Sequence, residues 1–275
     1  MMAEIQERVE ASFSSCHNLQ ITTALLWSMS SRIQPNQHVT QQEAHLINLH
    51  CDRILAAARA FSWTAVLDTF DRTSGHQYFH ALLHQQIPVA IEQSSLQSVD
   101  WKIRILVSQD GKVEISPAPI ILHPVNGVPR WPRVPEKLSE VSSIEVCLVL
   151  VDSVPTPASE FTTHKTNSRK HYDEARSRCN IEHDAPTESE VLLFNEAHEV
   201  MEASLCTPYF LRNGLWVTPA LSSGGNAGVS RRVAFEAGLC VEKTLHIDEL
   251  IVGEIIWLSN AVRGFMPGRL QLLQK

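Results

Sequence analysis

The stretch H-K-T-N-S-R-K-H-Y-D-E-A-R, residues 164–176, holds one lysine, Lys165, among hydroxyl, amide and guanidinium side chains at the start of a helix-like run. It follows a segment with two prolines, V-P-T-P-A-S-E-F at 154–161. Most lysines are exposed, but a lysine amine can also form a covalent bond with a carbonyl-bearing cofactor. The stretch therefore leaves two roles open for Lys165, a solvated surface charge or a point of covalent attachment.

The composition is that of a globular chain rather than a disordered one. Of the 275 residues, 44% are hydrophobic and 19% are charged. The net charge of -7 argues against a nucleic-acid partner and against a basic membrane-binding surface. The first residues lack the pattern of a secretory signal, and the longest apolar run, 146–151, is too short to span a membrane. We therefore expect a cytoplasmic protein with neither a nucleic-acid nor a membrane partner.

The cysteines and histidines show no spacing that is typical of a metal site or a redox motif. A chain of this length does not need disulfides to hold its core, so we expect reduced thiols. The 13 histidines are expected on the surface or in the core, and no metal site is expected. The six cysteines are at positions 16, 51, 147, 179, 206 and 240.

The first half of the chain predicts one strand, two helices and a hairpin. The segment Q-I-T-T-A-L-L-W-S-M, 20–29, reads as a strand, and 44–61 has apolar residues at helical spacing. A second helix is expected from Tyr78 to about Gln93. The alternation in 101–115, with Asp110-Gly111 at its centre, predicts a β-hairpin.

The second half predicts mainly short strands. A buried strand is expected at 143–151, followed by strands at 190–194 and 199–204 and a hairpin about Asn213-Gly214. The glycine-rich stretch 222–238 predicts a loop that leads into a short helix. These elements indicate an α+β protein with mostly antiparallel sheets and flanking helices.

Two lobes are expected from the distribution of prolines and apolar runs. We expect a smaller N-terminal lobe at 1–151 and a larger C-terminal lobe, which carries Lys165, at 164–275. The segment 152–163 has two prolines and few large apolar residues, so it is the candidate linker.

The glycine-rich loop is a candidate anion site. Free N–H groups at a helix start, together with the helix dipole, attract anions, and Gly228, Val229 and Ser230 would supply such groups. Arg231 and Arg232 would add positive charge. The spacing matches neither a Walker loop nor a dinucleotide-binding motif. A plain turn from loop to helix remains the alternative.

Pyridoxal phosphate needs three groups that this chain could supply. These are a lysine for its aldehyde, an anion site for its phosphate and an acid near its pyridine nitrogen. Lys165 is the candidate lysine, Glu202 in V-M-E-A-S the candidate acid, and Arg53 in H-C-D-R-I-L an added phosphate ligand. Each residue taken alone is as readily explained as an ordinary surface charge.

Read in order, these segments resemble the class IV aminotransferase family, the fold type IV pyridoxal phosphate enzymes with the D-amino acid aminotransferase-like fold. The resemblance runs from about Ile21 to Pro267. It is carried by H-C-D-R-I-L-A-A-A, H-K-T-N-S-R, V-M-E-A-S-L-C-T-P-Y-F, L-W-V-T-P with A-G-V-S-R, and W-L-S-N-A-V-R-G-F-M-P. It implies that the cofactor is pyridoxal 5'-phosphate and that its ligands are Arg53, Lys165, Glu202, Val229, Ser230, Asn260 and Ala261.

Within the family, two details resemble the 4-amino-4-deoxychorismate lyases of the fungal type. The strand I-T-T-A, 21–24, is similar to the lyase strand in which the second threonine, here Thr23, assists catalysis alongside the lysine. Arg169 stands four places after Lys165, as in those lyases. The resemblance implies a lyase reaction that yields 4-aminobenzoate and pyruvate, a role in folate synthesis, and a homodimer. Candidate residues for the substrate carboxylates are Arg104, Arg169 and Arg263, because arginine binds carboxylates in a planar, bidentate way.

Two departures keep other members of the family in view. Leu25 and Leu26 stand where the family usually has an arginine after the threonine or glycine, and the glycine-rich loop is longer than usual. A branched-chain or D-amino acid transaminase would use the same lysine but would need a keto-acid acceptor. A cofactor-binding relative with a different substrate, or without turnover, is the other alternative.

Overall fold

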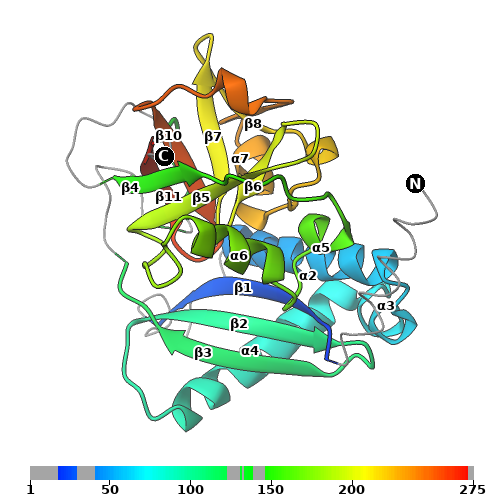
Figure 1. Ribbon diagram of the computed structural model, residues 1–275. Helices are drawn as coiled ribbons and strands as arrows, with labels where there is room; N and C mark the ends of the chain where they lie inside the picture. The colour runs from blue at the N-terminus through cyan, green and yellow to red at the C-terminus, as the bar shows by residue number, and fades with distance from the viewer. Residues whose placement is uncertain (1–17, 30–40, 123–130, 132, 139–145, 272–275) are drawn as a thin grey trace.

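The computed structural model contains one sheet of three strands and one of eight. Figure 1 shows the smaller sheet in the lower half of the molecule and the larger sheet in the upper half, with helix α2 (Gln41–Ala60) running between them. This α+β arrangement confirms the predicted fold class. The structure describes residues 18–29, 41–122, 131, 133–138 and 146–271.

The three-stranded sheet is antiparallel and has the order β1-β2-β3. The predicted strand and hairpin are confirmed, and the hairpin turns at Gly111, whose φ of +84° favours glycine. The residues of one face of β1 and β2 belong to a large apolar core, which the helices of this half complete. The strands are β1 (Gln20–Ser28), β2 (Asp100–Ser108) and β3 (Val113–Pro119).

Helices α2, α3 (Thr64–Phe70) and α4 (Gly75–Gln93) pack against that core. The two predicted helices are confirmed as α2 and α4. The apolar residues that recur along α2 include Ile54 and Ala57, both 1% exposed. Pro88 lies inside α4, which continues for five residues beyond it. The helical spacing of apolar residues therefore identified the core-facing side of α2.

The eight-stranded sheet has the order β6-β5-β4-β11-β10-β7-β8-β9. Antiparallel pairs predominate, and the parallel ones are β4–β5, β4–β11 and β8–β9. The predicted turn at Asn213-Gly214 joins β7 and β8, and both residues have positive φ. The strands are β4 (Cys147–Val151), β5 (Ser189–Phe194), β6 (Val200–Ala203), β7 (Thr207–Arg212), β8 (Leu215–Pro219), β9 (Val241–Lys243), β10 (Ile255–Asn260) and β11 (Gly264–Leu270).

The position of β4 corrects the expected boundary after residue 151. The strand at 147–151 was expected in the N-terminal lobe, but it pairs with β5 and β11 in the larger sheet. Its five residues are nearly all buried between these neighbours. The change from one sheet to the other therefore precedes β4, and 152–163 continues from a strand of the larger sheet.

The remaining elements join the two sheets or cover the larger one. Helices α5 (Glu160–Thr163) and α6 (Lys170–Arg178) follow β4, and α7 (Val229–Glu236) begins after Gly228, as the glycine-rich loop predicted. Short 3-10 turns occur at η2 (Leu221–Ser223) and η3 (Ile247–Glu249). In Figure 1, α5 and α6 lie in front, between the two sheets.

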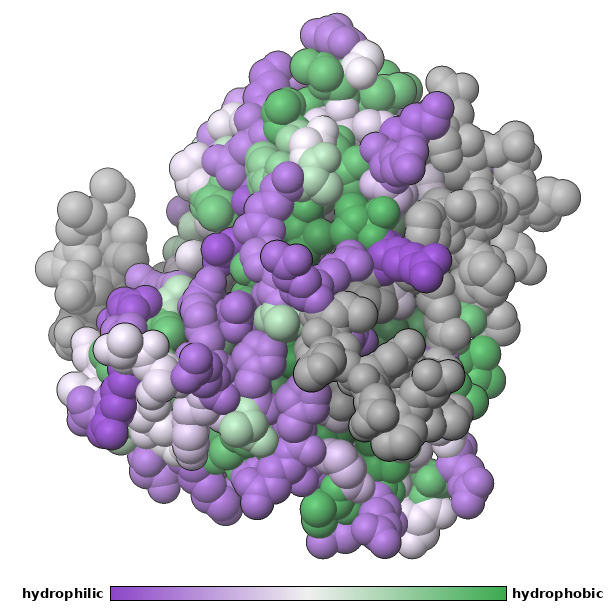
Figure 2. Space-filling view, turned by 180° about the vertical axis from the view of Figure 1, so that it is seen from behind, coloured by the Kyte–Doolittle hydropathy of each residue, from purple (hydrophilic) through white to green (hydrophobic). Residues whose placement is uncertain are grey.

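The described cysteines are all free and buried, and Cys16 lies outside the described residues, as does most of the proline-marked loop expected at 124–135. Within the described ranges, no group of three or more His, Cys, Asp or Glu side chains could hold a metal ion. None of the described helices is long and apolar enough to cross a membrane. Figure 2 shows the molecule from behind, with exposed apolar residues among hydrophilic ones in the upper half, which holds the eight-stranded sheet.

Candidate active site

A cavity of about 270 Å³ lies where the two sheets meet. Its walls come from β1 and β2 of the small sheet, from α2, from the segment around Lys165, and from β6, β10 and the start of α7 in the other half. Residues that are far apart in the sequence therefore converge on one space. All but one of the predicted site residues line it: Arg53, Arg104, Lys165, Arg169, Glu202, Val229, Ser230, Asn260, Ala261 and Arg263.

Lys165 is held in the cavity by a short pairing of its backbone with β1. Its carbonyl accepts a hydrogen bond from Thr22 N–H at 2.9 Å, and the N–H of Asn167 donates to the carbonyl of Gln20 at 3.0 Å. Burial lowers the pKa of Lys165 to about 7, and the positive charges of Arg53 and other cations act in the same direction. A large share of this amine is therefore neutral near pH 7, as a nucleophile or a general base requires.

Glu202 lies on β6 and lines the same cavity. Tyr172 Oη donates to its Oε1 at 2.5 Å, and the backbone N–H of Asn226 also binds the carboxylate. Burial raises the pKa of Glu202 to about 7, while these hydrogen bonds and the charge of Lys165 oppose the rise. Among the described residues that line the cavity, Glu202 is the only carboxylate. It can therefore share or hold a proton with a basic ligand atom.

An anion-binding corner is formed by α2 and the start of α7. Val229 and Ser230 are the first residues of α7 and line the cavity, and N–H groups in the first turn of a helix have no partner within the helix, so they are available as donors to an anion. Arg53 reaches the same corner from α2 and donates to Asn226 Oδ1, while its buried Nε has no hydrogen-bond partner among the described residues. Such an unpaired buried donor indicates a site for a ligand that accepts hydrogen bonds.

The charge at this corner comes from Arg53, and the expectation for Arg231 and Arg232 was wrong. Arg231 is turned away from the cavity, where it binds the Pro219 carbonyl and Glu242. Arg232 forms ion pairs on the surface. Both guanidinium groups are instead held by carboxylates outside the cavity, Arg231 by Glu242 and Arg232 by Asp52 and Glu236.

Asn260 and Ala261 form the tight turn between β10 and β11 at the cavity wall. Asn260 Oδ1 accepts the N–H groups of Val262, at 3.0 Å, and Arg263, at 2.8 Å. Ser259, the preceding residue, donates to Ser230 Oγ at 2.9 Å and so links this turn to the start of α7. The turn therefore keeps a second set of backbone groups next to the anion-binding corner.

Four cations line one side of the cavity. Arg104 on β2, Arg169 and Arg263 were predicted there, and Lys102, two residues before Arg104 on the same face of β2, joins them. Burial and the neighbouring arginines lower the pKa of Lys102. The concentration of positive charge favours a ligand with more than one negative charge.

Thr23 is the predicted site residue that does not line the cavity. It is 0% exposed, and its Oγ1 lies 2.6 Å from Nδ1 of His50 on α2, behind the cavity wall. Side chains alternate along a strand, so Thr22 and Ala24 face the cavity while Thr23 faces the core. Thr23, predicted to assist catalysis, therefore does not reach the cavity, and Thr22 is the threonine that lines it.

Sequence reasoning also missed three residues that complete the site. Lys102 could have been found, because K-I-R on a strand puts Lys102 and Arg104 on one face. Tyr172 and Asn226 gave no signal of their own. Their roles depend on contacts with Glu202 and Arg53 that only the tertiary structure provides.

The comparisons with known proteins agree with this arrangement. A protein-family model that is described as Amino-transferase class IV matches residues 38–270 of this chain. An aminodeoxychorismate lyase from Saccharomyces cerevisiae is 31% identical over 61% of this chain, and a putative aminodeoxychorismate lyase from Schizosaccharomyces pombe is 27% identical over 82%. The chain spans about half the length of the first relative, 51%, and 84% of the second.

A solved structure of a putative amino-acid aminotransferase from Mesorhizobium loti has the same fold. It superposes with a TM-score of 0.61 at 19% identity, over 92% of this chain and 100% of its own. Since the family model matches most of the chain and the ordered motifs converge on one cavity, this chain belongs to the class IV aminotransferase family.

Proposed function

We propose that the chain is a pyridoxal phosphate-dependent lyase that converts 4-amino-4-deoxychorismate to 4-aminobenzoate and pyruvate. The observation that carries the proposal is the convergence, in one cavity, of Lys165 with a lowered pKa, Glu202, an anion-binding corner and four cations. The printed names of the two fungal relatives support the same reaction.

The cavity residues fit pyridoxal phosphate. The buried Nε of Arg53, which has no partner in the described part of the chain, and the N–H groups of Val229 and Ser230 at the start of α7 would hold the phosphate. Lys165 would hold the aldehyde carbon, and Glu202 would face the pyridine nitrogen. When bound, the cofactor supplies an electron-withdrawing ring that weakens the bonds at the amine-bearing carbon of the substrate.

The chain's own residues would then bind the substrate and move one proton. Lys165, neutral near pH 7, takes the proton from the amine-bearing carbon, and Glu202 holds a proton at the cavity wall. Arg104, Arg169, Arg263 and Lys102 bind the two substrate carboxylates. The carbon–oxygen bond to the enolpyruvyl group breaks, that group takes up a proton to become pyruvate, and the remaining ring becomes aromatic.

The assay that tests this function contains purified protein, pyridoxal phosphate and 4-amino-4-deoxychorismate, with no keto acid. We expect pyruvate and 4-aminobenzoate to be released in equal amounts. If neither product is released, and if the protein transfers an amine from an amino acid once a keto acid is added, the chain is a transaminase and not a lyase.

We assign assistance of the leaving group to Thr22, in place of Thr23. Replacing Thr22 by valine should lower turnover about tenfold, because it removes the hydroxyl at the cavity, which donates to the Ile105 carbonyl at 3.1 Å and whose oxygen can accept a further hydrogen bond. Replacing Thr23 by valine should lower the free energy of unfolding by about 1–3 kcal/mol, because His50 loses its partner, and should leave turnover within about twofold. Steady-state kinetics and urea unfolding of both variants test this, and a larger loss of turnover in Thr23→Val would reverse the assignment.

The lowered pKa of Lys165 predicts how cofactor uptake depends on pH. Below about pH 7 the amine is protonated and cannot attack the aldehyde, and above it the amine is neutral. Stopped-flow mixing of the cofactor-free protein with pyridoxal phosphate should therefore show a rate that rises through about pH 7 and then levels off. Free lysine, measured as the control, should continue to speed up toward its ordinary pKa of 10.5. A protein profile that follows the free lysine would contradict the lowered pKa.

We further propose that the protein acts in the cytoplasm as a homodimer that supplies 4-aminobenzoate for folate synthesis. Light scattering on the purified chain of 30.8 kDa tests the oligomeric state. A mass near twice that value supports the dimer, and a mass near 30.8 kDa contradicts it.

A further inference from the structure

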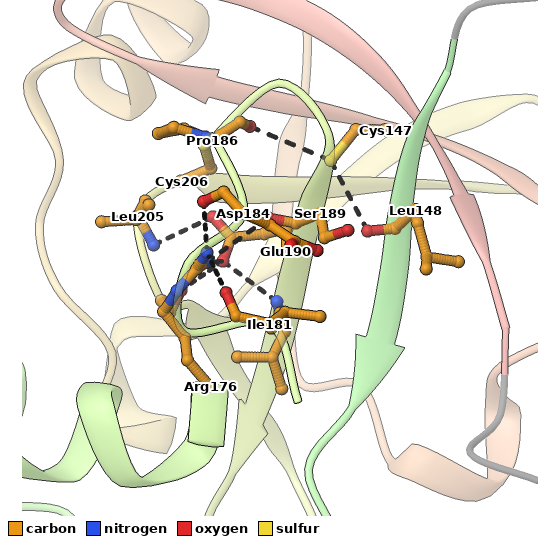
Figure 3. Close-up of polar contacts among 12 residues, drawn as sticks. Cys147, Leu148, Arg176, Ile181, Asp184, Pro186, Ser189, Glu190, Leu205 and Cys206 are labelled. Atoms are coloured by element: carbon orange, nitrogen blue, oxygen red, sulfur yellow. Dashed lines mark hydrogen bonds and ion pairs between the residues drawn. The ribbon is translucent and has the colours of Figure 1, made fainter. Parts of the chain in front are cut away.

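A buried ion pair lies behind the cavity wall, and neither of its members lines the cavity. Nη1 of Arg176, in α6, is 3.6 Å from Oε1 of Glu190, in β5, and their side chains are 7% and 0% exposed. Removing two charges from water costs free energy, which is offset only where hydrogen bonds satisfy the remaining polar atoms. Figure 3 shows the contacts that do so and indicates what the pair holds in place.

Glu190 holds the turn between β6 and β7 from behind. Ser204 Oγ donates to Glu190 Oε1, and the N–H of Leu205 donates to Oε2 at 2.9 Å. Burial and the charge of this carboxylate raise the pKa of the neighbouring Cys206 thiol. All three turn residues line the cavity. One carboxylate therefore fixes a continuous piece of the cavity wall.

Arg176 ties the same turn to the loop that follows α6. Its Nη1 donates to Ser204 Oγ at 3.2 Å, while Nη2 donates to the carbonyls of Ile181, at 2.7 Å, and Asp184, at 2.9 Å. Arg176 is itself part of α6, and its guanidinium binds the loop after α6 and the turn between β6 and β7 (Figure 3). Ser204 Oγ, which donates to Glu190 and accepts from Arg176, is the atom at which these bonds meet.

The turn extends this network to a cation in the cavity. The backbone carbonyl of Ser204 accepts a hydrogen bond from Nη2 of Arg169 at 3.1 Å. The guanidinium of Arg169 also lies over the ring of Tyr172, 4.8 Å from its centre. The contact of Arg169 with Asp173 is longer, 3.7 Å, and that carboxylate is 68% exposed. The Ser204 carbonyl is therefore the better ordered anchor of this guanidinium.

We propose that Glu190, Arg176 and Ser204 are positioning residues that orient the guanidinium of Arg169 toward a substrate carboxylate. They act through the Ser204 backbone and do not touch the substrate carboxylate themselves. The inference rests on the proposed function, since it takes the substrate to carry carboxylates. It adds that recognition of the dianion depends on a charged pair outside the cavity.

Isophthalate, an aromatic dicarboxylate without an amine, is a probe that separates binding from chemistry. Its Kd is measured by calorimetry on the holoenzyme of the wild type, Ser204→Ala, Arg169→Met and the double variant. We expect each single substitution to raise Kd about tenfold. The double variant should be no more than about twofold weaker than Arg169→Met, because residues that act through one another are not additive.

Two further variants exclude a general loss of packing. Ser204→Thr keeps the hydroxyl and should hold Kd within about threefold of the wild type. Ser223→Ala removes a hydroxyl that is 0% exposed, has no hydrogen-bond partner in the described part of the chain and does not line the cavity. This control should leave Kd unchanged. Arg176 itself is kept, because its loss would leave Glu190 as an unpaired buried charge.

Additive effects of Ser204→Ala and Arg169→Met would overturn the inference, as would an unchanged Kd in Ser204→Ala. Failure of isophthalate to bind the wild type would also overturn it, because Arg169 would then recognise no carboxylate. A failure of the proposed function would give a different result. If the coupling is present but 4-amino-4-deoxychorismate yields no products, only the identity of the substrate is wrong and the positioning role stands.

Discussion

Replacement of Lys165 by alanine should lower turnover of 4-amino-4-deoxychorismate at least about 1,000-fold, because it removes both the proposed attachment point of the cofactor and the proposed general base. Lys165 lines the cavity, and burial lowers its pKa to about 7, so the amine can give and take a proton near neutral pH. No other described lysine combines a cavity position with a pKa that low. Release of pyruvate, followed under saturating cofactor, measures the effect.

Lys170→Ala is the matched control for this substitution. Lys170 lies five residues later, its side chain is 84% exposed, and it has only a loose contact with Glu174 at 3.7 Å. Its loss should change turnover by less than about twofold, since surface ion pairs contribute little. Turnover that survives in Lys165→Ala would remove the lysine from the reaction and with it the lyase mechanism.

Replacement of Glu202 by glutamine should lower kcat about 100-fold while cofactor binding is largely kept. Glutamine has the same shape but carries no charge, whereas the proposed role of Glu202 requires a carboxylate that would keep a proton on the pyridine nitrogen. Arg53 and the start of α7 remain to bind the phosphate, so the dissociation constant of the cofactor should change much less than kcat. Steady-state kinetics and a cofactor titration measure the two quantities separately.

Glu196→Gln is the control, because Glu196 is exposed in the turn between β5 and β6 and does not line the cavity. It should leave kcat and cofactor affinity unchanged. An unchanged kcat in Glu202→Gln would mean that the carboxylate serves only the packing of Tyr172, which donates to it at 2.5 Å.

The sequence motifs were sufficient to predict which residues meet in one cavity, and to predict most strands and helices. Lys165, Glu202 and Arg53 stand in segments with a clear local pattern, and all three line one cavity. The face of β1 was harder to read. In I-T-T-A-L-L both faces carry apolar residues, so the alternation alone does not decide which threonine points to the core, and the resemblance that selected Thr23 did not reveal that its side chain is buried.

Features that depend on long-range pairing could not be predicted. β4 pairs in parallel with β5 and β11, and a run of apolar residues does not indicate which sheet it will join. The pair of Arg176 and Glu190 joins a helix to a strand, and each looks like an ordinary surface charge in the sequence. Lys102 is different, because the strand pattern that identified Arg104 applies to it equally.

The most direct test of the account is to find which lysine carries the cofactor. The holoenzyme is reduced with borohydride and digested, and the peptides are weighed for a pyridoxyl group. Two lysines with lowered pKa values line the cavity, Lys165 and Lys102, so Lys102 serves as an internal control for the labelling. We predict that the label is on Lys165 and absent from Lys102. A label on Lys102, or no label on either lysine, would contradict the account.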